Sequence, residues 1–285
     1  MRPLIYTLML VCGVGAVRLW GQGAYTPEAG KFTVTPSYTY QTFDRFYNSK
    51  DSIRLRNFGI EDIQQHAASV SAEYGITNDL AVDVTLGYVI AYVDNVLVPG
   101  DPKTIDGLND TLIGLRYRLI DEARMDNLWT PTLTARLGAI LSGTYRAGFI
   151  NSPGDGAFGI EPSLLAGRYY EGLGLGYYAS SAFRVRFDVP DEFVGGVGIY
   201  KVLFNRLIVS FGYQRLHSIS GVDFDSPDFR LDRFQELREE SDTIKYGIGY
   251  LDPAGNSYNL NFGNVLHGKN VGESFIIDVS ATIPF

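Results

Sequence analysis

The sequence predicts an all-β protein: an antiparallel β-barrel of about 12 strands that crosses a membrane. Alternating apolar and polar residues recur from about residue 31 to the end of the chain, as expected for strands with one apolar face. The composition agrees, since 32 Gly, 19 Tyr and 17 Phe in 285 residues favour strands and turns over helices. An export leader and a terminal aromatic residue complete the prediction.

The first residues have the pattern of a signal peptide. Arg2 supplies a basic start, the apolar stretch 4–17 follows, and small residues precede a possible cut after residue 16 or after residue 23. The apolar stretch is shorter than the ~20 residues that a spanning helix needs. We therefore expect residues 1–23 to be a signal peptide and residues 24–285 to form one barrel domain. Because the lone Cys12 lies in the leader, the sequence excludes disulfides and thiolate sites in the mature chain.

The final segment shows the alternation most clearly, and the segment 80–92 repeats it. Apolar residues of the final segment fall on one face, at Phe275, Ile277, Val279, Ala281, Ile283 and Phe285. Counting similar segments predicts strands near residues 31–46, 63–76, 80–92, 108–120, 129–141, 157–170, 173–188, 191–204, 206–219, 242–252, 256–266 and 272–285. An even number of strands places both termini on the same side of the membrane, the periplasmic side.

Alternation alone also fits a soluble sandwich with its apolar face turned inward. Three features favour a barrel in the bacterial outer membrane: the leader, the aromatic residues at strand ends, and the alternation of short turns with longer polar loops. Phe285 ends the last strand, and we expect this terminal aromatic residue to be the signal that the outer-membrane barrel assembly machinery recognises. A balance of 24 basic and 32 acidic residues, a net charge of -8, argues against nucleic acid as a partner.

Two segments carry a resemblance to a known family. Residues 74–80 read Tyr-Gly-Ile-Thr-Asn-Asp-Leu, and residues 107–119 read Gly-Leu-Asn-Asp-Thr followed by an alternating strand. From about residue 70 onward the chain resembles the outer-membrane family named for the meta-pathway (MetA pathway) of phenol degradation. It departs at Asn109-Asp110, where members often have Gly-Asp. The resemblance implies a channel or uptake protein for small hydrophobic or aromatic compounds, and it carries over no functional residue.

Ten charged residues on the polar faces are expected to point into the barrel. They are Glu73, Asp83, Arg116, Arg118, Arg136, Glu161, Arg184, Arg186, Lys245 and Asp278. Two interpretations stay open for this lumen charge network. The charges either form salt bridges that pack a small lumen, or they line a pore and tune its selectivity.

Enzymatic chemistry has little support in the sequence. His66, His217 and His267 stand near strand ends, and none has a serine at a spacing that suggests a catalytic pair. We expect no enzyme, no cofactor and no metal site. An outer-membrane hydrolase and a structural or adhesive barrel acting through its loops remain the alternatives. The acidic stretch 223–242 is expected to be a solvated loop, with cation-mediated contact to lipopolysaccharide as the alternative.

Overall fold

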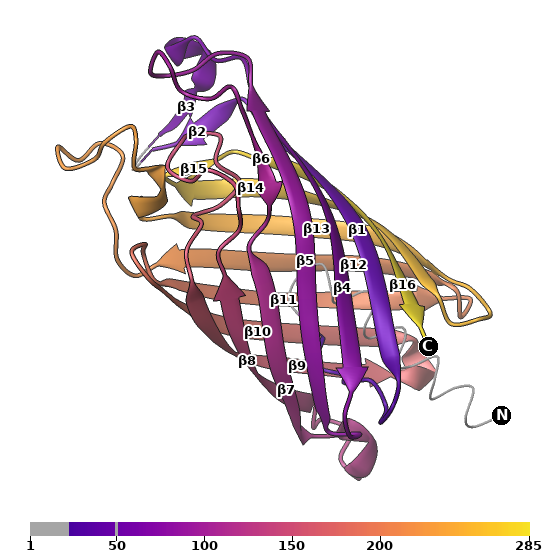
Figure 1. Cartoon of the computed structure of the whole chain (residues 1–285). Helices are drawn as coiled ribbons and strands as arrows, with labels where there is room; N and C mark the ends of the chain where they lie inside the picture. The colour runs from indigo at the N-terminus through magenta and orange to yellow at the C-terminus, as the bar shows by residue number, and fades with distance from the viewer. Residues whose placement is uncertain (1–22, 49–50) are drawn as a thin grey trace.

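The computed structural model describes residues 23–48 and 51–285, which form a barrel of long tilted strands (Figure 1). The predicted leader lies, up to residue 22, outside the described residues. In the described part of the chain, no helix is long and apolar enough to cross a membrane. The helical turns there are the short 3-10 segments η1 (Leu55–Phe58), η2 (Glu122–Arg124), η3 (Glu171–Leu173) and η4 (Phe234–Glu236).

The predicted barrel of 12 antiparallel strands is confirmed. Its wall consists of β1 (Phe32–Phe43), β4 (Ile63–Gly75), β5 (Leu80–Val93), β6 (Thr104–Leu108), β7 (Thr111–Ile120), β8 (Thr132–Leu141), β9 (Gly159–Tyr170), β10 (Leu175–Arg186), β11 (Glu192–Leu203), β12 (Leu207–Ser218), β13 (Glu240–Leu251), β14 (Ser257–Lys269) and β16 (Phe275–Pro284). Strands β6 and β7 both pair with β5 and share one place, so thirteen strands fill twelve places. The sheet closes because β1 pairs with β4 on one side and β16 on the other.

Five predicted strands differ from those observed by three residues at one end. The strand expected at 108–120 begins at Thr111, after the separate β6, and the strand expected at 256–266 continues to Lys269. The strand expected at 31–46 ends at Phe43, and residues beyond it form β2 (Arg45–Tyr47) in a separate small sheet. That sheet also contains β3 (Ser52–Arg54) and β15 (Val271–Gly272), so the strand expected at 272–285 begins only at Phe275. The strand expected at 129–141 begins at Thr132, because the connection before it contains η2. Alternation of apolar and polar residues identifies the strands of the wall, whereas the short segments β2, β3, β15 and η2 show no such pattern.

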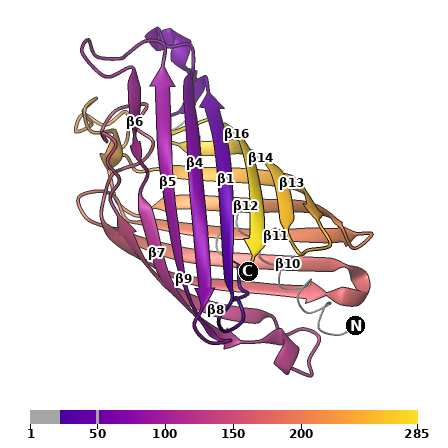
Figure 2. The same ribbon diagram turned by 45° about the vertical axis from the view of Figure 1, so that its right-hand side comes forward.

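The two ends of the barrel differ (Figure 2). Short turns at residues 76–79, 171–174, 204–206 and 252–256 lie at the end that also holds the C-terminus, here called the turn end. The opposite loop end carries the long connections 44–62, 94–103, 142–158 and 219–239. Apolar side chains hold these loops together, in a cluster of Phe46, Leu55, Ile60, Ile63, Val93, Phe234 and Leu237. The loops at this end are therefore packed against one another.

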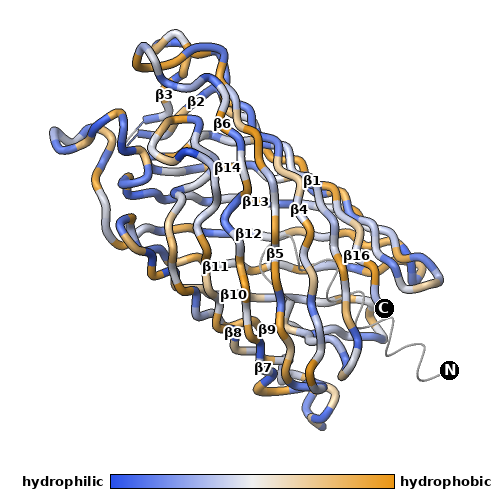
Figure 3. Tube along the Cα trace, in the orientation of Figure 1, coloured by the Kyte–Doolittle hydropathy of each residue, from blue (hydrophilic) through white to orange (hydrophobic). Residues whose placement is uncertain are grey.

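Apolar and polar residues alternate along the wall strands (Figure 3). On β5 the apolar face is exposed on the outside, at Val82, Leu86, Tyr88, Ile90 and Tyr92. Their neighbours Ala81 and Asp83 are buried inside. An exposed apolar band on a closed sheet is the surface that a lipid bilayer covers, because closure leaves no unpaired strand edge in the hydrocarbon.

The first and last strands of the wall, β1 and β16, pair with each other and form the seam of the barrel. The rings of Phe32 and Phe285 stack with centroids 4.5 Å apart and an angle of 7° between their planes. The backbone N–H of Phe285 donates to the carbonyl of Phe32 over 2.8 Å. The terminal aromatic residue thus packs across the seam that closes the barrel.

We predict that Phe285→Asp lowers the amount of folded barrel in the membrane, because it removes the ring stack and places a charge at the seam. The fraction of protein that migrates faster on detergent gels before boiling than after it measures closed barrel. Phe204→Asp, at another exposed aromatic residue of the turn end, is the matched control. Equal folded fractions for the two variants would contradict a special role of the seam.

Candidate functional site

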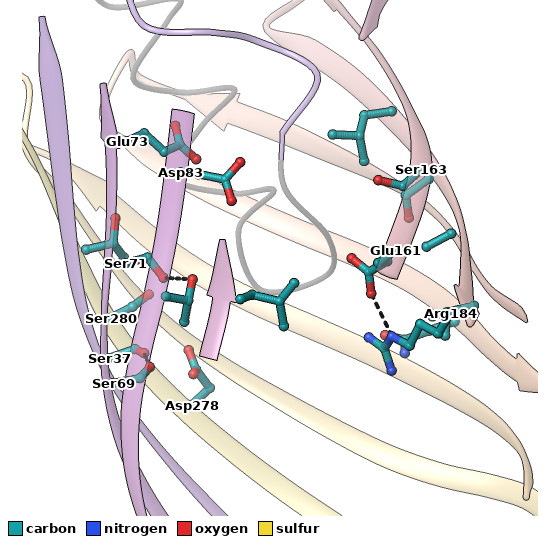
Figure 4. A pocket seen from close by; sticks show the side chains of 18 of the residues that line it. Ser37, Ser69, Ser71, Glu73, Asp83, Glu161, Ser163, Arg184, Asp278 and Ser280 are labelled. Atoms are coloured by element: carbon teal, nitrogen blue, oxygen red, sulfur yellow. Dashed lines mark hydrogen bonds and ion pairs between the residues drawn. The ribbon is translucent and has the colours of Figure 1, made fainter. Parts of the chain in front are cut away.

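The interior of the barrel has two unlike walls (Figure 4). Strands β1, β4 and β16 present mainly hydroxyl groups together with Glu73 and Asp278, while β9 and β10 present Glu161 and Arg184 beside serines such as Ser163. A cavity of about 390 Å³ lies between the two walls. Ser37, Ser69, Ser71 and Ser280 line one side of it, and Glu161 and Arg184 line the other. This volume falls within the range of small-molecule sites.

Paired charges lie on the inner face of β4, β5, β7, β8 and β9. Arg116 on β7 is fully buried, and its Nη1 lies 2.6 Å from Oε1 of Glu73 on β4. Arg136 on β8 donates to Asp83 over 2.9 Å and to Glu161 over 3.0 Å. Because a buried charge is costly unless it is paired and hydrogen-bonded, these groups hold one another in place.

Glycines make room for the guanidinium of Arg136. A Cβ atom at Gly114 would lie 2.5 Å from Nε of Arg136, and one at Gly138 would lie 2.4 Å from its Nη1. Both glycines occupy inward positions on β7 and β8. The plane of the guanidinium therefore lies flat against the wall, and this leaves the space in front of it to the cavity.

The row of charges continues toward the loop end. Arg184 on β10 lies 2.6 Å from Glu161 and 3.3 Å from Glu192, and Arg186 lies 3.0 Å from Glu192 and also pairs with Asp155. Sequence reasoning missed Glu192 and Asp155. Glu192 is the first residue of β11 and the register partner of Arg184. Following the alternation of β11 back to this first residue would have identified it as inward-facing. Asp155 lies in a loop, where alternation gives no signal.

The remaining predicted charges lie apart from this row. Arg118 sits at the turn end, where it pairs with Asp79 over 3.1 Å and with Asp121 over 3.5 Å, rather than meeting Glu73 or Asp83. Lys245 donates to Oε1 of Gln214 over 2.9 Å. Asp278 accepts from Thr39 over 2.9 Å. Seven of the ten residues thus belong to the charge row, and Arg118, Lys245 and Asp278 lie apart from it.

Hydroxyl groups bond to one another on the opposite wall. Ser37 and Ser69 lie 2.7 Å apart, and Thr35 and Thr282 lie 3.1 Å apart. Ser71 bonds to Thr85 over 2.8 Å. Each pair bridges neighbouring strands on the inner face. The wall is polar and uncharged over most of this surface, so it can exchange hydrogen bonds with water or with a passing solute.

A second cavity, of about 460 Å³, lies under the loops. Its lining combines aromatic side chains, Phe43, Phe46, Phe149 and Phe234, with charged ones, Asp155, Arg184, Arg186, Glu192 and Glu239. Arg184 and Gln214 line both cavities, so the two spaces adjoin. We call the second cavity the vestibule and the first the central cavity.

Tyr145 anchors the inward-folded loop 142–158 beside the vestibule. Its hydroxyl donates to Asp110 over 3.0 Å and accepts from the backbone N–H of Gly156 over 2.8 Å. Burial, reinforced by the charge of Asp110, raises the pKa of Tyr145 above its usual value. The tyrosine is therefore neutral and able to donate, which holds this loop over the interior.

Residues 23–26 enter the turn end of the lumen. Ala24 and Thr26 are 2% and 1% exposed. The carbonyl of Tyr25 accepts from Arg116 over 3.0 Å, and the hydroxyl of Thr26 donates to the carbonyl of Asn78 over 3.0 Å. Arg116 thus links the charged wall to this segment, which narrows the lumen at the turn end.

The three histidines lie away from the lumen. His66 bonds to Tyr38 over 2.7 Å, His217 lies 3.5 Å from Glu240, and His267 lies 3.7 Å from Asp242. These partners are a phenol and carboxylates at the loop end of the wall. The acidic stretch 223–242 is largely engaged in ion pairs, including Asp223 with Lys269 at 2.8 Å and Asp232 with Arg230 at 3.0 Å.

Comparisons with known proteins place this geometry among outer-membrane barrels. No protein-family model and no curated protein matches the sequence. The COG4313 outer membrane channel from Pseudomonas putida F1 is similar in structure, with a TM-score of 0.70 and 12% identity over 92% of this chain and 98% of that one. The Pseudomonas putida toluene transporter TodX gives a TM-score of 0.41 and 12% identity over 92% and 90%, and the KdgM porin 0.44 and 9% over 88% and 99%. At 12% identity, the similarity to the COG4313 channel shows the fold of an outer-membrane β-barrel.

We predict that Asp83→Ala and Arg136→Ala each destabilise the barrel by about 3–5 kcal/mol, because each breaks the buried ion pair between these two residues. Unfolding by urea in lipid vesicles measures the free energy, and the double variant should cost less than the sum of the two. If the lumen conducts, Asp83→Ala should also shift ion selectivity toward anions. Costs below about 1 kcal/mol for both single variants, as for exposed pairs, would contradict the pairing.

The loop-end carboxylates predict a dependence of stability on pH. Burial, and then the charges of Asp155 and Glu192, raise the pKa of Glu239 well above its usual value, and Arg186 opposes them. Burial also raises the pKa of Asp155, with Arg186 opposing and Glu192 and Asp110 adding to it. A raised carboxyl pKa gives stability that is fully present below the ordinary pKa and is lost as pH rises through the raised one.

We therefore expect Glu239→Gln to flatten the fall in melting temperature as pH rises above the ordinary carboxyl pKa of about 4.5. Melting curves of the wild type and this variant at rising pH make the comparison. Glu236→Gln, which removes a carboxylate paired with Arg233 on the loop surface, is the control and should leave the wild-type profile in place. Identical profiles for wild type and Glu239→Gln would contradict the effect.

Proposed function

We propose that this protein is a passive outer-membrane channel for the uptake of small solutes. The observation that carries the proposal is the pair of adjoining cavities inside a closed barrel, running from beneath the loops to the middle of the lumen. Polar walls let a solute exchange hydrogen bonds as it moves, and the apolar outer face keeps the barrel in the bilayer.

The vestibule supports a solute class. Its aromatic lining offers apolar and stacking contacts, which suit a small hydrophobic or aromatic compound entering from the loop end. This agrees with the implied resemblance to the family named for the meta-pathway of phenol degradation, which we keep as part of the proposal. Toluene transport is a property of TodX, and here it motivates only the choice of an aromatic probe.

An enzymatic role has no support from the placement of the candidate bases. Each histidine contacts a phenol or a carboxylate on the outer side of the loop end, and none of the three contacts that the structure describes there is with a serine. We propose no cofactor. Membrane lipid, lipopolysaccharide and the barrel assembly machinery remain proposed partners, in keeping with the apolar wall and the terminal Phe285.

The test is flux into protein-containing vesicles of nicotinamide, an uncharged aromatic probe, and of arabinose, an uncharged polar one. Ser163→Trp should reduce flux severalfold, because Ser163 lines the central cavity and a bulky ring there would fill it. Leu164→Trp, at the neighbouring exposed residue of β9, is the matched control and should leave flux unchanged. Absence of flux in the wild type would contradict the channel and favour a structural or adhesive barrel.

A further inference from the structure

The lining of the central cavity includes a hydrogen-bonding atom that the protein does not use. Asp278 on β16 lines this cavity and is 9% exposed. Its Oδ2 accepts from Thr39, but its Oδ1 is buried without a hydrogen-bond partner. Such an acceptor costs free energy unless something supplies a donor. Figure 4 shows Asp278 beside the serines of β1 and β4, toward the same space.

An unused donor lies on the adjacent strand. Asn261 on β14 is the register partner of Asp278, is 6% exposed, and its Nδ2 is likewise buried without a partner. The side chain lies over Gly247, where a Cβ atom would come within 2.0 Å of Oδ1 of Asn261. The absence of a side chain at Gly247 thus leaves room for the amide against the wall. One acceptor and one donor are left side by side on the inner face.

The other carboxylates that line the cavity are already paired. The carboxylates across the cavity, Asp83 and Glu161, are paired with arginines. These two carboxylates therefore have opposite charges beside them. Asp278 and Asn261, in contrast, leave one acceptor and one donor unused. A hydroxyl group, which both donates and accepts, satisfies the two at once.

We propose that Asp278 and Asn261, with Ser280 beside them, form a subsite that binds the hydroxyl groups of an uncharged polyhydroxylated solute. This deepens and rests on the proposed function, because it assigns the central cavity a solute chemistry distinct from the aromatic vestibule. A solute with an apolar ring face and several hydroxyls fits both cavities in succession. Ser280 lines the cavity two residues along β16 and adds a further hydroxyl.

The test compares four probes built on one six-membered ring. They are myo-inositol, cyclohexanone, cyclohexylammonium and cyclohexanecarboxylate. Binding is measured by saturation-transfer NMR on the full-length protein in a detergent that carries no sugar, and blockage of single-channel current in planar bilayers gives a second readout. We expect myo-inositol to bind and the other three to bind at least about tenfold more weakly, since they lack the hydroxyls that satisfy both atoms.

Variants locate the binding. Asn261→Ala removes the donor and Asp278→Asn removes the carboxylate, and each should weaken myo-inositol binding by about tenfold. Asn259→Ala is the matched control, since Asn259 faces inward two residues away on β14 and bonds to Ser257 over 3.5 Å. It should leave binding unchanged. Melting curves confirm that each variant is folded before its binding is compared.

The outcomes separate the two proposals. A barrel that passes no current and no solute overturns the channel, while the NMR measurement still decides the subsite. A conducting barrel that does not bind myo-inositol overturns the subsite alone, with water as the occupant of the two polar atoms. Preferential binding of cyclohexylammonium or cyclohexanecarboxylate would also overturn it, because the site would then recognise charge rather than hydroxyl groups.

Discussion

The structure depends on one constraint: in a bilayer, the backbone N–H and C=O groups of the wall must all find partners within the protein. A sheet meets this condition only by closing, and here β1 closes it by pairing with both β4 and β16. Closure turns alternate side chains to opposite sides. The apolar set faces lipid, and the polar set is forced into a narrow interior, where its members must satisfy one another.

The charge row on the inner wall follows from that crowding. Arg136 cannot be buried alone, so Asp83 and Glu161 flank it, and Arg184 shares Glu161 with it. Glycines at 114 and 138 let the guanidinium lie flat. Because these charges are matched locally, the lumen presents polar groups and little uncompensated charge to a solute. On the opposite wall, serines and threonines pair across strands and leave the carboxylate of Asp278 and the amide of Asn261 partly unsatisfied.

Sequence reasoning succeeds where period two governs the chain. The wall strands and the inward parity of residues such as Asp83 follow from alternation, because a strand with one lipid face has no other choice. It fails where geometry depends on chain segments far apart. Arg118 pairs with the turn residues Asp79 and Asp121. Strand β2 pairs with β15, which lies near the other end of the chain. A local sequence pattern encodes neither contact. The loop residue Asp155 and the unused amide of Asn261 become visible only when the strands are placed in register.

The central claim is that inward residues line a water-accessible path while their neighbours face lipid. Cys12 is the only cysteine in the sequence and lies in the predicted leader, so single cysteines can be introduced into an otherwise thiol-free barrel. Ser280→Cys and Val279→Cys are neighbours of opposite parity on β16. A charged, membrane-impermeant thiol reagent should modify the cysteine at position 280 and spare the one at position 279. Modification of the cysteine at 279 with protection of that at 280 would contradict the account.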